Sequence, residues 1–108
     1  MKVYIYNGRI VATEAEGLES ALVNGPLLDV YFQERYLLAR NHLLDRDVAL
    51  PDDLSPLDFL ERYDRSTFDA IGRVALGWIV AHPEDYGIMV EDMSSILIAP
   101  WMIMERRR

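Results

Sequence analysis

The sequence predicts one α+β domain over residues 1–108, because strand patterns lie at both ends of the chain and helix patterns lie between them. A length of 108 residues suits one domain and is short for two. A hydrophobic fraction of 51% can build a core and excludes an intrinsically disordered chain. Terminal strands most simply share one antiparallel sheet. We therefore expect an N-terminal β-hairpin and a C-terminal strand pair in that sheet, with about four helices packed on one face.

Residues 2–13 are predicted to form the hairpin. β-branched and aromatic side chains fill Lys2–Tyr6 and Arg9–Thr13, and Asn7-Gly8 between them strongly favours a two-residue turn. A regular ladder from this turn pairs Tyr6 with Arg9, Ile5 with Ile10, Tyr4 with Val11, and Val3 with Ala12. We expect Val3, Ile5, Ile10 and Ala12 to face the core. The opposite face is amphipathic and is either a second buried layer or an exposed binding face; it carries Tyr4, Tyr6, Arg9 and Val11.

The first three helices are predicted from spacing and caps. A short helix covers 14–24, and the chain after it turns at Asn24-Gly25-Pro26. The longest covers 27–44, where apolar side chains recur at helical spacing. A third begins at Ser55-Pro56, an N-cap followed by proline at the first helical position, and runs to about residue 63.

The fourth helix is predicted from a capping box at residues 66–69 (Ser-Thr-Phe-Asp) to about Ala81. It is apolar nearly all round, which favours a central buried position. Its residues Ala70, Gly77 and Ala81 share one stripe that would allow close packing. Gly72 and Gly77 have the Gly-x4-Gly spacing of a phosphate loop, but no Lys-Ser/Thr follows, so this spacing indicates packing.

Two strands are predicted after the fourth helix. The first contains residues 88–90, and the second covers 96–104, where Pro100 favours an edge strand or a bulge. A helix over residues 90–97 is the alternative. Alternation along the second strand puts Met102 and Met104 on one face and Trp101 and Ile103 on the other. Both faces then need cover, and a homodimer is one way to provide it.

The composition excludes several classes of protein. The chain has no cysteine, which excludes disulfides, thiolate nucleophiles and iron–sulfur clusters and fits a reducing compartment. Its apolar windows are shorter than the about 18–20 residues of a membrane-spanning helix, and the N-terminus turns too early for a signal peptide. We expect a soluble, cytoplasmic protein.

The two histidines give little support for catalysis or metal binding. His42 precedes Asp45 and Asp47, but the residues after them lack the acids and the glycine of a calcium loop, which favours a helix-end interaction. His82 stands beside Glu84 and Asp85, so a small histidine–carboxylate enzyme is a third functional hypothesis. No nucleophile elbow or oxyanion hole accompanies it. We expect no catalytic residue, metal or cofactor.

Charge is the compositional feature that suggests a partner. Eighteen acids face eleven bases, a net charge of −7, and three of those bases are the terminal arginines 106–108. Such a field repels nucleic acid and anionic membranes and attracts basic protein surfaces. The acids are densest in residues 45–69, although a solvated surface is the plain alternative for this segment. The candidate partner-binding residues are Asp45, Asp47, Asp52, Asp53, Asp58, Glu61 and Asp64.

The first functional hypothesis is a small acidic module that blocks a basic site on a partner protein. Carboxylates can replace phosphates in arginine-rich sites because both accept forked hydrogen bonds from a guanidinium. Inhibitors, immunity proteins and nucleic-acid mimics such as anti-CRISPR proteins offer an analogy of size and charge alone. The second hypothesis is a homo-oligomeric assembly protein that packs its apolar C-terminal strands and tyrosine-bearing hairpin face against a second copy.

Overall fold

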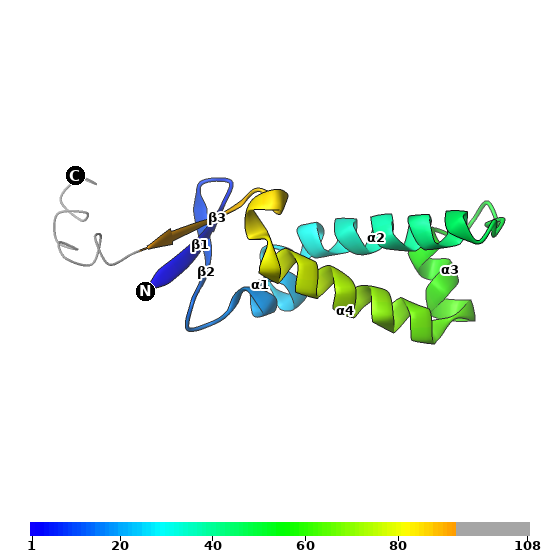
Figure 1. The fold of residues 1–108 in the computed structure, drawn as a ribbon, viewed down its shortest axis with the longest axis horizontal. Helices are drawn as coiled ribbons and strands as arrows, with labels where there is room; N and C mark the ends of the chain where they lie inside the picture. The colour runs from blue at the N-terminus through cyan, green and yellow to red at the C-terminus, as the bar shows by residue number, and fades with distance from the viewer. Residues whose placement is uncertain (93–108) are drawn as a thin grey trace.

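The computed structural model describes residues 1–92 and confirms the α+β class (Figure 1). The second predicted C-terminal strand, residues 96–104, lies outside the described residues. The strands are β1 (Lys2–Tyr6), β2 (Arg9–Thr13) and β3 (Ile88–Asp92). The helices are α1 (Leu18–Asn24), α2 (Leu28–Asp45), α3 (Pro56–Tyr63) and α4 (Arg65–Ala81), with a short 3-10 helix η1 (Pro83–Tyr86) before β3.

The sheet joins the two ends of the described chain. Its strand order is β2-β1-β3, and β1 pairs antiparallel with both neighbours. The hairpin turn forms where predicted, since Asn7 and Gly8 both have positive φ angles, of 53° and 77°. The prediction that the N-terminal hairpin and a later strand share one antiparallel sheet is therefore confirmed.

A β-bulge in β2 changes the predicted hairpin register. The pairs Tyr6–Arg9 and Ile5–Ile10 form as expected, but the register then shifts, so that Tyr4 pairs with Ala12 and Val3 with Thr13. The two remaining predicted pairs are wrong by one residue because Val11 is an additional, unpaired residue. A bulge of this kind bends the strand and moves the following side chains to the other face.

The bulge decides which side of the hairpin faces the helices. Ala12 shares the side of Tyr4 and is buried in a cluster with helix residues, and the tyrosines of β1 pack against that cluster. Val3 is buried as expected, whereas Ile10, expected in the core, is 55% exposed. The tyrosine-bearing side is therefore the side that packs against the helices.

Two apolar clusters lie at different levels of the molecule. The first lies between the sheet, α1 and the neighbouring ends of α2 and α4; its members are Ala12, Leu18, Ala21, Leu22, Leu27, Ile79 and Ile88. The second lies where α3 packs on α2 and α4; its members are Ala39, Leu43, Leu57, Leu60 and Ile71. The helices α2 and α4 run side by side from the first cluster to the second, so α3 lies far from the sheet (Figure 1).

Two of the predicted helix starts are wrong. The first helix begins at Leu18 and not at residue 14, because the side chains of Thr13 and Glu16 hydrogen-bond within a turn there. The N-cap of α4 is Asp64 and not Ser66. Asp64 also ends α3, where its N–H donates to Leu60, so a single residue joins the two helices. The predicted cap of α3, Ser55, is confirmed by a hydrogen bond from the N–H of Asp58.

Close packing of α4 uses a different stripe from the one predicted. Gly72 and Ala75 are buried, whereas Gly77 and Ala81 are exposed. The hydroxyl of Tyr31 in α2 donates to the carbonyl of Gly72 over 3.2 Å, which ties the two long helices together.

Candidate functional site

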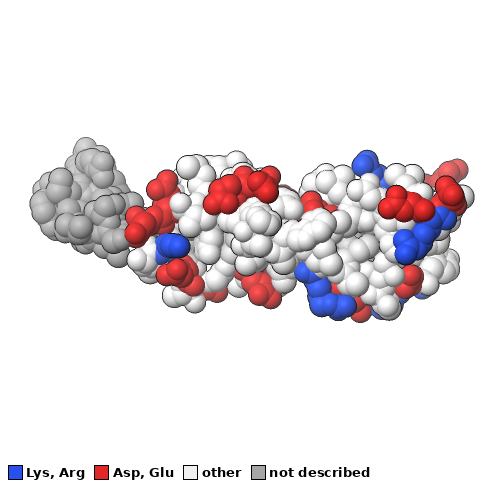
Figure 2. Space-filling model, in the orientation of Figure 1, with Lys and Arg blue, Asp and Glu red and all other residues white. Residues whose placement is uncertain are grey.

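The seven acids predicted to bind a partner all lie on the surface at the end of the molecule formed by α3. All seven are exposed. Arginine side chains share this end, and Figure 2 shows acidic and basic atoms close together there. Two neighbouring arginines are Arg46 and Arg62. The structure therefore places the predicted residues in one region but mixes them with cations.

Asp64, one of the seven, has a structural role. Its carboxylate accepts hydrogen bonds from the backbone N–H and the hydroxyl of Thr67, over 3.2 and 2.7 Å. These hydrogen bonds lower the pKa of Asp64 below its ordinary value, since they favour the charged form. The carboxylate of Asp64 is therefore engaged in capping α4.

The larger excess of negative charge lies at the other end of the molecule, the end that carries the sheet. We call residues 1–34 and 82–92 the sheet end, and residues 35–81 the helical end. The helical end holds eight acids and six arginines. The sheet end holds only the bases Lys2 and Arg9 against nine acids, and on the face in Figure 2 acidic atoms predominate there. These acids are Glu14, Glu16, Glu19, Asp29, Glu34, Glu84, Asp85, Glu91 and Asp92.

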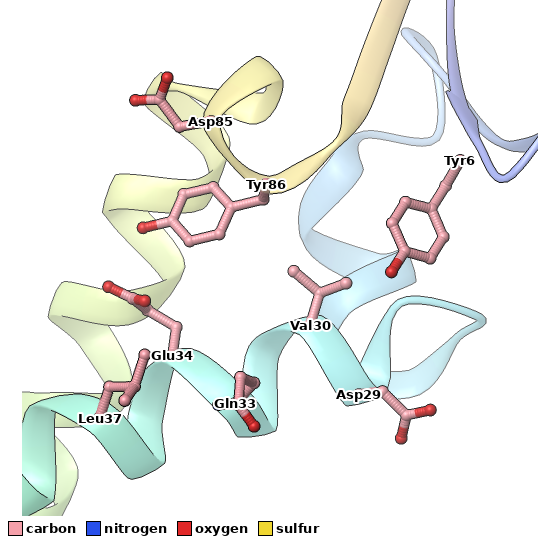
Figure 3. A pocket seen from close by; sticks show the side chains of 8 residues that line it. All are labelled: Tyr6, Asp29, Val30, Gln33, Glu34, Leu37, Asp85 and Tyr86. Carbon is pink, nitrogen blue, oxygen red and sulfur yellow. The ribbon is translucent and has the colours of Figure 1, made fainter.

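A pocket of about 550 Å³ opens at the sheet end between α2, η1 and β1 (Figure 3). Three carboxylates and two phenol rings line it, together with apolar and amide side chains, and no lysine or arginine does. The lining residues are Tyr6, Asp29, Val30, Gln33, Glu34, Leu37, Asp85 and Tyr86. We call this the acidic tyrosine pocket.

Local chain geometry explains how the pocket forms. Val30, Glu34 and Leu37 recur at helical spacing, so they lie along one side of α2. Pro83 starts the turn η1, and Gly87 ends it in the left-handed conformation with φ 76°. The reversal places Tyr86 beside α2, while the chain continues into β3 next to Tyr6.

Tyr86 and Glu34 form the polar centre of the pocket. Burial raises the pKa of Tyr86 to about 12, helped by its hydrogen bond with Glu34 and by the charges of Glu34 and Asp85. The phenol therefore stays neutral near pH 7 and donates to the Glu34 carboxylate. Figure 3 shows its hydroxyl directed toward Glu34, with Tyr6 on the other side of Val30.

Neither histidine belongs to this pocket. Nδ1 of His42 accepts a hydrogen bond from the guanidinium of Arg46 over 3.1 Å near the end of α2. His82 is exposed at the junction of α4 and η1. Within residues 1–92, no group of three or more histidine or acidic side chains is arranged to hold a metal ion. Over the same residues, no helix combines the length and the apolar character needed to cross a membrane.

Comparison with protein-family models, with curated proteins and with solved structures finds no match to this chain. The charge distribution and the pocket geometry are therefore the features of the molecule that point to a function. Sequence reasoning missed this pocket because its lining residues come from three separate segments. A usable signal was the spacing of Asp29, Val30, Gln33, Glu34 and Leu37, which gives one side of the predicted longest helix a polar and apolar mixture.

Proposed function

We propose that the protein is a small acidic binding module that covers a basic site on a partner protein and blocks it, as an inhibitor, immunity or anti-defence protein does. The observation that carries this proposal is the charge of the sheet end, where nine acids face two bases. Eight of those nine acids are exposed. A surface of one sign attracts an oppositely charged partner over a distance and selects against acidic ones.

The seven predicted acids at the helical end are the alternative surface for the same function. They are equally exposed, but arginines of the same segment reduce their net charge. We therefore place the main contact at the sheet end and use the helical end as its matched control.

The test uses full-length protein and two charge-neutralised variants. The sheet-end variant carries Glu19→Gln, Glu84→Gln and Glu91→Gln, and the helical-end variant carries Asp52→Asn, Asp53→Asn and Glu61→Gln. A partner is captured from host cells, identified and purified, and its affinity and activity are then measured at low and high salt. We expect the affinity to fall with salt, the partner's activity to fall on binding, and the sheet-end variant to bind more weakly.

Two results would contradict the proposal. Affinity that stays the same at low and high salt would exclude an electrostatic contact. Equal affinity of both variants and the native protein would exclude the acidic surface as the binding site.

A second candidate function is homo-oligomeric assembly, and exposed apolar side chains on α4 favour it. Val74 and Trp78 lie one turn apart and are 42% and 49% exposed. Val74 also lines an open pocket of about 450 Å³ between α2 and α4. Sedimentation at micromolar concentration tests this candidate: Trp78→Glu should dissociate an oligomer, and a strict monomer would remove it.

A further inference from the structure

We infer that the acidic tyrosine pocket binds the guanidinium of an arginine side chain on the partner. This inference rests on the proposed function and names the chemical group that the sheet end recognises. Charge is its first support, because Asp29, Glu34 and Asp85 line the pocket and no cation does. Three carboxylates that line one pocket repel anions and attract a cation.

The aromatic walls select a planar, weakly hydrated cation. Tyr6 and Tyr86 stand on either side of Val30, so both rings border the space above α2 (Figure 3). A guanidinium interacts favourably with the face of an aromatic ring and also donates in a fixed fork to carboxylates, which an ammonium does less well. The chain already places one guanidinium against aromatic rings: Arg35 lies 5.1 Å from the ring centre of Tyr31 and 5.0 Å from that of Phe68.

Glu34 is the carboxylate best placed to recognise the cation. It is half-buried, whereas Asp29 and Asp85 are exposed. The Tyr86 hydroxyl occupies part of its acceptor capacity and fixes its position, and a carboxylate has about four lone-pair sites, so others remain for an incoming donor. Partial burial strengthens such a charge-assisted hydrogen bond relative to one in open solvent.

The size of the pocket fits a whole side chain. A volume of about 550 Å³ exceeds that of a guanidinium alone and leaves room for its aliphatic stem. Val30 and Leu37 supply apolar contact for the stem. Arginine therefore matches the negative charge, the aromatic rings and the apolar floor of the pocket.

The test titrates isotopically labelled full-length protein with argininamide and follows its NMR spectrum. We expect shifts at Tyr6, Glu34 and Tyr86, weaker binding of lysinamide, and no binding of the uncharged analogue citrullinamide. Glu34→Gln should weaken argininamide binding by about tenfold or more, because it removes a charge-assisted hydrogen bond. Asp29→Asn lowers the charge of the pocket without touching the Tyr86 hydrogen bond, and should weaken binding as well. Glu61→Gln is the matched control, since Glu61 is exposed at the helical end and does not line the pocket.

Three outcomes would overturn the inference. Equal binding of argininamide and citrullinamide would exclude recognition of charge. Equal effects of Glu34→Gln and Glu61→Gln on argininamide binding would exclude the pocket as its site. If the Glu34→Gln variant binds argininamide more weakly but binds the partner with unchanged affinity, the pocket binds a free organic cation and not an arginine of the partner. In this last case the salt dependence of partner binding would still support the proposed function, so failure of the inference is distinct from failure of the proposal.

Discussion

The two glycines inside α4 provide a quantitative test of how α2 and α4 pack. Gly77 is exposed, and a Cβ added there would meet nothing within 4 Å. Alanine loses less backbone conformational entropy than glycine when it folds into a helix, so Gly77→Ala should stabilise the protein by about 0.5–1 kcal/mol. Gly72→Ala would stabilise the protein by the same amount if the space around Gly72 were equally open.

At Gly72 the gain is opposed by one atom. A Cβ there would lie 3.1 Å from the hydroxyl oxygen of Tyr31, the same atom that donates to the Gly72 carbonyl. The ring must move by a few tenths of an ångström and lengthen a hydrogen bond that is already 3.2 Å long. Loss of that bond removes about 0.5–1.5 kcal/mol. Gly72→Ala should therefore range from about 0.5 kcal/mol stabilising to about 1 kcal/mol destabilising.

Urea unfolding followed by circular dichroism measures both effects, with Tyr31→Phe as the second background. Removal of the hydroxyl should let Gly72→Ala stabilise as much as Gly77→Ala, which gives a coupling energy of about 0.5–1.5 kcal/mol. Equal stabilisation by both alanines in the native background would refute the close contact. A coupling energy near zero would refute the role of the Tyr31 hydroxyl.

Three further predictions concern stability. Asp64→Ala should lower the midpoint of thermal unfolding, and Ser66→Ala should change it little. Because folding lowers the pKa of Asp64, the contribution of its carboxylate to stability is present above pH 3.8 and is lost as the pH falls further. The pKa of Tyr86 rises from 10.0 to about 12 on folding, so the neutral phenol stabilises the protein below pH 10 and this stabilisation is lost toward pH 12. Urea unfolding at several pH values should show this loss, and Tyr86→Phe should remove the pH dependence. Ile79→Ala should lower the free energy of unfolding by about 2–5 kcal/mol, since Ile79 is fully buried, and Val80→Ala, at an exposed position, by less than about 0.5 kcal/mol.

Elements with strong local signals could be predicted from the sequence. The turn at Asn7-Gly8 forms as expected, and the predicted helices over 27–44 and 56–63 match α2 and α3 to within one residue. The predicted start of the fourth helix was wrong because Asp64 and Ser66 are both good N-cap residues. The end of α3 decided between them, since Asp64 serves both helices.

The bulge could not be predicted from two strands alone. β1 also pairs with β3 in a regular register, which places Tyr4 opposite Val90 and Tyr6 opposite Ile88. The buried Ile88 belongs to the core under the helices, so both tyrosines are directed to that side. In β2 the small residue Ala12 pairs with Tyr4, so Val11 is the additional residue of the bulge.

The charge distribution shows why density along the chain is a poor guide to the electric field. Residues 45–69 have the densest run of acids, yet Asp64 is held by Thr67 and Asp69 pairs with Arg65 over 3.2 Å. The sheet end collects its acids from β3, η1 and the first parts of the chain, and its two bases offset little of their charge. A partner senses the net charge within about a Debye length, roughly 8 Å at physiological salt, and not the number of acids in a sequence window. The acidic binding surface therefore remains a proposal, and we place it at the sheet end because the net negative charge is larger there than at the helical end.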